Sequence, residues 1–183
     1  RDLPSFPTRR SSDLRFLPQC YYAKQEGTTN VTTETGAGQW GAALSYAAKI
    51  YGLDCAVYQV KITMQQKPYR SSIMRTFGAV VTGSPSMSTR AGKDILTKDP
   101  THSGSLGTAI SEAVELATTT PNCKYTLGSV LNHVGLHQTI IGLEAEKQMA
   151  MAGEYPDIVI GCFCGGSNFG GISFPFMRHN LSG

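Results

Sequence analysis

Apolar and polar residues alternate along the chain in short blocks, and glycines close several of these blocks. Runs of β-branched residues such as residues 30–33 predict strands, whereas Ala-rich runs such as residues 42–51 predict helices. The expected strands cover residues 30–33, 55–60, 79–82 and 124–127, and the expected helices cover residues 17–26, 42–51, 65–77, 105–117 and 132–152. Because strands and helices follow each other in turn, the sequence predicts an α/β fold with mainly parallel sheets flanked by helices.

Two further segments have distinct patterns. Residues 83–104 are polar and interrupted by Gly and Pro, which predicts a long loop. Long loops in compact domains are more often functional or mobile than neutral. Residues 158–160 are β-branched and follow a Pro-Asp break, so they predict a short, buried parallel strand that leads into the glycine-rich residues 161–171.

Composition narrows the class of protein. The 183 residues are 40% hydrophobic and 16% charged, which suits one globular domain, or one domain and part of another. The net charge of +3 comes without a basic stripe, so nucleic-acid binding is not indicated. Five cysteines without a Cys-x-x-Cys pair favour a reduced protein, and no membrane helix or signal peptide is evident, so we expect a cytoplasmic location.

Residues 1–14 differ from the rest of the chain. They contain two prolines and show no periodicity. We expect them to be a non-native or disordered prefix, and they are left out of the fold prediction.

The glycine-rich run after residue 160 predicts a phosphate site. Ser167 and Asn168 are favourable helix N-cap residues, so the run places free backbone N–H groups at the start of a helix. Glycines let the chain approach a phosphate closely, although a plain strand-to-helix turn has the same composition. The run matches neither the dinucleotide fingerprint nor the P-loop.

A second strand-loop-helix junction lies at Glu34-Thr-Gly-Ala-Gly-Gln-Trp-Gly41. Its glycines and the following helix predict another anion site. Glu34 beside this loop can donate and accept a proton if burial raises its pKa, and the alternative is a strand-end Glu facing water.

Two other pairs suggest metal chemistry only weakly. His133 and His137 lie four residues apart on an expected helix, but no third ligand stands at a recognisable spacing. Cys162 and Cys164 are better explained as buried thiols near the loop, because thiolate metal sites usually need four ligands. We therefore predict no metal site.

Five motifs in order between Leu17 and Phe176 together resemble tryptophan synthase β chains. These motifs are residues 17–27, 34–41, 66–70, 102–107 and 161–171. Trp40 in the first glycine loop and the Gln-Lys-Pro-Tyr-Arg run resemble the second, divergent branch of that family. The resemblance implies a lyase of fold type II that uses pyridoxal phosphate and makes L-tryptophan from L-serine and indole, the last step of tryptophan biosynthesis.

The resemblance also implies site residues. Glu34 matches the acid/base residue, and residues 83–104 fall in the communication and lid region. The loop that binds the substrate carboxylate matches Thr35, Gly36, Ala37, Gly38, Gln39 and Trp40. The loop that binds the cofactor phosphate matches Cys164, Gly165, Gly166, Ser167 and Asn168. Partners implied for the full-length enzyme are a second copy of the chain and, weakly or transiently, a tryptophan synthase α subunit.

The chain departs from the family pattern at three points. The position of the family's cofactor-binding lysine is occupied by Ser12, and Cys164 stands where the family has glycine. The resemblance covers an N-terminal domain over residues 15–152 and the start of a second domain over residues 153–183, so we expect an inactive fragment, truncated at both ends. A related serine or threonine dehydratase and an inert anion-binding domain are the alternatives.

Overall fold

A computed structural model describes residues 13–163 and 165–181 of the chain. They form two compact units, residues 16–126, which we call the sheet unit, and residues 127–163 and 165–181 together with 13–15, which we call the helical unit. The boundary between the two units lies directly after Thr126. The boundary predicted at residue 152 separates the domains of a longer enzyme, and it stays a prediction. Within the described residues, no helix is long and apolar enough to span a membrane.

The sheet unit contains four parallel strands in the order β3-β2-β1-β4. The strands are β1 (Asn30–Thr35), β2 (Asp54–Val60), β3 (Val80–Ser84) and β4 (Cys123–Tyr125). The helices are α1 (Asp13–Gln25), α2 (Gln39–Tyr51), α3 (Lys61–Gln66), α4 (Pro68–Thr76), α5 (Arg90–Lys98) and α6 (Leu106–Thr119). This architecture confirms the predicted parallel sheet flanked by helices, and α1 begins inside the segment expected to be a prefix.

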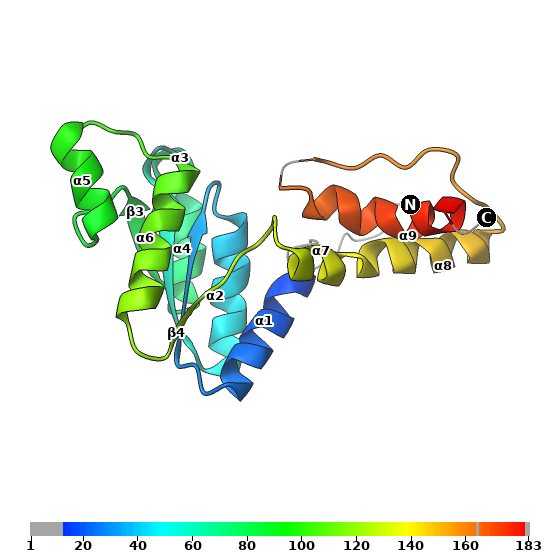
Figure 1. The fold of residues 1–183 in the computed structure, drawn as a ribbon, viewed down its shortest axis with the longest axis horizontal. Helices are drawn as coiled ribbons and strands as arrows, with labels where there is room; N and C mark the ends of the chain where they lie inside the picture. The colour runs from blue at the N-terminus through cyan, green and yellow to red at the C-terminus, as the bar shows by residue number, and fades with distance from the viewer. Residues whose placement is uncertain (1–12, 164, 182–183) are drawn as a thin grey trace. The chain divides into compact units, whose positions relative to one another are not determined.

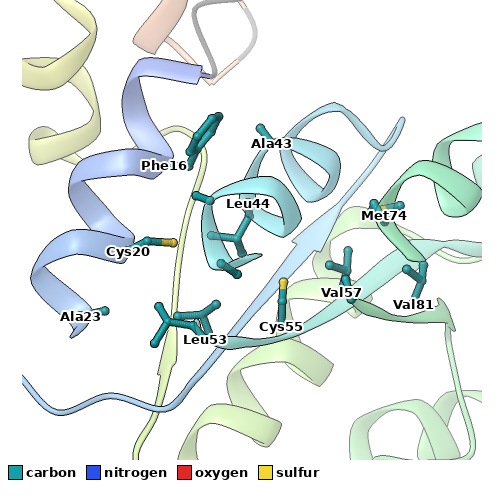
Figure 2. Packing of buried hydrophobic residues seen from close by; sticks show 14 residues of the cluster. Phe16, Cys20, Ala23, Ala43, Leu44, Leu53, Cys55, Val57, Met74 and Val81 are labelled. Atoms are coloured by element: carbon teal, nitrogen blue, oxygen red, sulfur yellow. The ribbon is translucent and has the colours of Figure 1, made fainter. Parts of the chain in front are cut away.

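Alternation along the strands separates two apolar layers. On β2, Cys55 and Val57 face one layer, while Tyr58 and Val60 face the other. The first layer packs α1, α2 and α4 against the sheet around Leu44 (Figure 2). The second layer packs α6 against β1, β2 and β4, so α2 and α6 lie on opposite sides of the strands (Figure 1).

The predicted long loop at residues 83–104 is wrong in its centre, because α5 occupies it. Thr89 caps this helix by accepting a hydrogen bond from the Gly92 N–H at 3.0 Å. The side chains that hold the start of α5 lie on α6, which is distant in the sequence. The composition of residues 83–104 therefore does not reveal them. The next helix, α6, is observed close to its predicted range, and the Ser105 hydroxyl caps it by accepting a hydrogen bond from the Thr108 N–H at 3.1 Å.

The helical unit contains α7 (Asn132–Gln138), α8 (Ile140–Ala152) and α9 (Ser167–Leu181). The single helix predicted over residues 132–152 is interrupted at Thr139. The predicted buried strand at residues 158–160 is also wrong, since Ile158 and Ile160 are 77% and 88% exposed and non-regular. A parallel strand needs a neighbouring strand, and the described part of this unit contains none.

Candidate active site

Glu34 is the last residue but one of β1, so it lies at the C-terminal ends of the four parallel strands. Ligands of open α/β sheets usually bind at the C-terminal ends of the strands. The Glu34 side chain is buried, with 6% of the residue exposed, which excludes the alternative of a strand-end Glu facing water. One of its carboxylate oxygens, Oε2, accepts a hydrogen bond from the Tyr125 hydroxyl on β4.

Two opposing effects act on the pKa of Glu34. Burial raises it above the ordinary value, and the hydrogen bonds from Tyr125 and from the backbone act in the opposite direction. Burial thus makes the neutral form of this carboxyl easier to reach than it is for a carboxyl in water.

The glycine loop after Glu34 turns directly into α2. Gly38 has a φ of 91° and forms the N-cap of this helix, a left-handed conformation that favours glycine. Thr35 is buried, and its hydroxyl accepts a hydrogen bond from the Gly41 N–H at 3.3 Å. Ala37 and Gln39 are exposed, and the first turn of α2 carries no acidic side chain. The backbone N–H groups at the start of α2 therefore have no acidic side chain in the same turn that would compete with a bound anion.

Two elements hold this loop from the side. The Thr63 hydroxyl of α3 donates to the Gly36 carbonyl. The stem of Arg70 lies so close that a β-carbon on Gly38 would stand 2.7 Å from the Arg70 β-carbon. The Arg70 Nε atom is buried and has no hydrogen-bond partner among the described residues. A cation therefore lies beside the predicted carboxylate loop.

Trp40 ties the same loop to the strands. Its indole Nε1 donates to the Thr33 hydroxyl at 2.7 Å, and that hydroxyl donates to the Thr126 carbonyl at 2.7 Å. Trp40 is half-buried and contributes to the apolar layer under α2. The Trp40 side chain therefore fixes the loop to β1.

The second predicted loop lies in the helical unit. Gly166 has a φ of 86° and directly precedes α9, while a β-carbon on Gly165 would stand 2.1 Å from the Ser129 hydroxyl oxygen. The Ser129 and Ser167 hydroxyls are 2.9 Å apart, and Asn168 is exposed. Cys164 lies outside the described residues.

A pocket of 530 Å³ adjoins this loop within the helical unit. Gly165, Gly166 and Ser167 line it together with apolar side chains that include Leu131, Leu136 and Phe169. The first turn of α9 carries no acidic residue. Backbone N–H groups, hydroxyls and an apolar wall suit a small organic molecule that carries an anionic group.

Comparisons with known proteins identify the family of the chain. Residues 10–182 match the family described as pyridoxal-phosphate dependent enzyme. The chain belongs to this family. The match begins inside the segment predicted to be a prefix, and it includes both glycine loops.

Relatives of known name confirm the resemblance drawn from the sequence. Tryptophan synthase beta chain 2 of Thermotoga maritima is 55% identical over 177 residues, which make up 97% of this chain and 42% of that protein. Tryptophan synthase beta chain 2 of Methanothermobacter thermautotrophicus is 56% identical over 167 residues, 91% of this chain and 39% of that protein. The chain thus spans about two fifths of the length of these relatives.

Solved structures confirm the fold class. A hydrogen sulfide-producing enzyme from Fusobacterium nucleatum matches with a TM-score of 0.71 and 20% identity, over 96% of this chain and 47% of that one. A threonine deaminase from T.th. matches with a TM-score of 0.69 and 18% identity, over 96% of this chain and 48% of that one. At these identities the likeness shows the fold alone.

The loop before α9 fits the phosphate of this pyridoxal-phosphate dependent enzyme family. The conformation of Gly166 and the absence of space for a β-carbon at Gly165 form a backbone cradle at a helix start, and Ser167 adds a hydroxyl. The position that the resemblance implies for the cofactor lysine, Ser12, lies outside the described residues.

The structure brings the predicted residues together in two sets. Glu34 and residues 35–40 are contiguous in the sheet unit, and residues 165–168 are contiguous in the helical unit. The expectation that Cys162 is buried is wrong, because this residue is exposed. His133 and His137 contact each other through their rings, and no group of three metal-ligating residues occurs in the described residues.

Sequence reasoning missed three side chains around the first loop: Tyr125, Thr63 and Arg70. In the sequence, Arg70 belongs to one of the family motifs and Tyr125 to an expected strand, and neither pattern indicates a place beside Glu34. The position of Tyr125 at the end of a parallel strand was a usable signal, since such ends meet at one edge.

Proposed function

We propose that the full-length enzyme containing this chain is a tryptophan synthase β chain, which converts L-serine and indole to L-tryptophan and water. The observation that carries the proposal is the buried Glu34 carboxyl, attached to a glycine loop at the start of α2. This arrangement combines an anion site with a proton donor and acceptor. The 55% identity to named tryptophan synthase β chains supports the same conclusion.

In this proposal the first loop binds the carboxylate of serine. Backbone N–H groups of residues 36–40 and the positive end of α2 neutralise the charge, and Thr35 and Thr63 fix the loop. Glu34 donates a proton to the departing serine hydroxyl and accepts one when indole adds. Gly165, Gly166, Ser167 and Asn168 would hold the cofactor phosphate. Pyridoxal phosphate supplies an electron sink when bound.

The proposed partners are those of the full-length enzyme. They are a second copy of the same chain and a tryptophan synthase α subunit. The cytoplasmic location and the inactivity of the isolated 183-residue chain stay predictions.

A dehydratase is the competing function, because threonine deaminase shares the fold. The Glu-Thr-Gly-Ala-Gly-Gln loop favours tryptophan synthesis, since the carboxylate loop of dehydratases of this fold is similar to Ser-x-Gly-Asn instead. The two functions differ in whether a second substrate replaces the serine hydroxyl or water releases a keto acid.

Product identity tests the proposal. A full-length enzyme that carries residues 16–181 within a chain of the relatives' length is incubated with L-serine, with and without indole. We expect L-tryptophan as the main product when indole is present, with pyruvate formed only slowly. Pyruvate formation at the same rate in both samples, without tryptophan, would show a dehydratase.

A further inference from the structure

We infer that Tyr125 is a positioning residue that holds the Glu34 carboxylate in place through its phenol hydroxyl. The inference rests on the proposed function of Glu34. Nothing in the sequence motifs assigned a role to Tyr125, which lies 91 residues further along the chain.

Strand pairing brings the two side chains to one face of the sheet. β4 pairs with β1 in parallel, and Tyr125 stands opposite Thr32. Residues two apart on a strand share a face, so Thr32, Glu34 and Tyr125 all point toward α6. There the Tyr125 Oη donates its hydrogen bond to Glu34 Oε2. The Tyr125 ring packs beside Tyr58, Val60, Ala109 and Ala113, which limits its movement.

The short strand that carries Tyr125 is fixed by the next residue. Thr126 donates its backbone N–H to the Thr32 carbonyl at 2.9 Å, and its hydroxyl donates to the same carbonyl at 3.2 Å. In return, the Thr126 carbonyl accepts from Thr33, which also binds the indole of Trp40. Tyr125 therefore keeps its place relative to both Glu34 and the substrate loop.

The hydrogen bond also sets the proton affinity of Glu34. A phenol that donates to a carboxylate favours the charged form, while burial favours the neutral form. Burial and the contact with Glu34 raise the pKa of Tyr125 above its ordinary value, so the phenol stays a proton donor throughout the working pH range. Glu34 is thus held between two opposing influences.

Other charged or titratable groups lie on the elements packed against β1. They are Asp54, Cys55 and Tyr58 on β2, Tyr46, Lys49 and Tyr51 on α2, Glu112 and Glu115 on α6, and Cys123 and Lys124 on β4. The contributions to the pKa of Glu34 come from burial, the Tyr125 hydroxyl and the backbone. Tyr125 is therefore the side chain to change.

The test is a double-mutant cycle in the full-length enzyme, with Tyr125→Phe, Glu34→Gln and the double variant. Tyr125→Phe keeps the ring and removes the hydroxyl, so we expect kcat for tryptophan formation to fall about 10-fold, the effect of one lost hydrogen bond to a charged group. In the Glu34→Gln background the same change should have no further effect. Tyr22→Phe, at a tyrosine 60% exposed, is the matched control.

A titration measures the contact without using activity. ¹³C NMR of the labelled glutamate carboxyls, with Glu34 assigned by its absence in Glu34→Gln, should show Glu34 titrating at higher pH in Tyr125→Phe. The sign follows because the lost donor had favoured the charged form. Difluorotyrosine at position 125, a stronger donor, should move the titration to lower pH. This second variant retains the hydroxyl, so it can be used to test the same hydrogen bond if Tyr125→Phe does not fold.

The outcomes separate the inference from the proposed function. An unchanged Glu34 titration, or the same 10-fold loss in the Glu34→Gln background, overturns the role of Tyr125 while Glu34 keeps its own. Full activity of Glu34→Gln overturns the proposed acid/base role, and the inference fails with it.

Discussion

Two glycines in the loop before and within α2 lie too close to neighbouring atoms to carry a side chain. A β-carbon on Gly41 would stand 2.7 Å from the Met74 sulfur and 2.8 Å from a Val57 methyl group. A β-carbon on Gly38 would meet Arg70, and Gly38 also has a positive φ. Close packing of the loop and of α2 onto α4 and β2 thus depends on single residues.

Gly38→Ala tests this packing. The change forces a left-handed conformation on alanine and a clash with Arg70, at a cost of about 1–2 kcal/mol for the conformation and about 1–3 kcal/mol for the overpacking. Gly27→Ala is the matched control, because Gly27 has a φ of +77° but nothing within 4 Å of a β-carbon. Urea unfolding should show a larger loss of stability for Gly38→Ala. Equal losses would contradict the proposed contact with Arg70.

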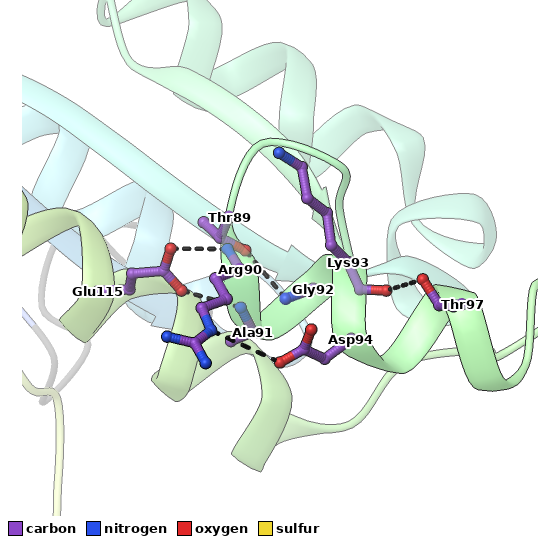
Figure 3. Close-up of polar contacts among 8 residues, drawn as sticks. All are labelled: Thr89, Arg90, Ala91, Gly92, Lys93, Asp94, Thr97 and Glu115. Carbon is purple, nitrogen blue, oxygen red and sulfur yellow. Dashed lines mark hydrogen bonds and ion pairs between the residues drawn. The ribbon is translucent and has the colours of Figure 1, made fainter.

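At the scale of elements, α6 fixes the start of α5 with two carboxylates. Glu115 accepts the Arg90 and Ala91 N–H groups at 2.6 and 2.9 Å (Figure 3). Glu112 is fully buried and accepts hydrogen bonds from Ser86 and Thr89 at 2.6–2.9 Å. Since the first turn of α5 has no acidic residue of its own, α6 supplies the negative charge that this helix start favours.

Glu115→Gln should therefore loosen the start of α5. The backbone N–H groups lower the pKa of Glu115 below its ordinary value. Its stabilising contribution is thus present above the unfolded-state pKa of about 4.3 and is lost as the pH falls through the lower folded-state value. At neutral pH, amide hydrogen exchange of Arg90 and Ala91 should be faster in Glu115→Gln than in the control Glu144→Gln, whose side chain is exposed on α8. Equal exchange in the two variants would disprove the anchoring.

These anchors explain why α5 escaped prediction from the sequence. Its capping carboxylate lies 25 residues away from Arg90, whereas prediction from composition weighs only near neighbours. Strands β1, β2 and β3 were predicted within two residues at each end, because the β-branched runs of β1 and β3 and the alternating pattern of β2 are local signals. The stretch 158–160 has the same local signal but no strand to pair with among the described residues.

At the scale of the whole molecule, each glycine loop was predictable and the environment of each was not. Glu34 and residues 35–40 form one continuous motif, so the sequence displays it. Tyr125 and Arg70 join that motif only through the parallel order of the strands and the packing of α4. The family resemblance identified the chemistry, and the fold identifies which side chains support it.

The most direct test of the central claim is the rate of tryptophan formation by the full-length enzyme and its Glu34→Gln variant, measured at saturating L-serine and indole. Removing a positioned general acid/base typically costs about 10²- to 10⁴-fold in rate. We predict a loss in this range with cofactor absorbance unchanged, because the loop proposed to hold the cofactor phosphate, residues 165–168, does not include Glu34. Equal rates for the two enzymes would contradict the account.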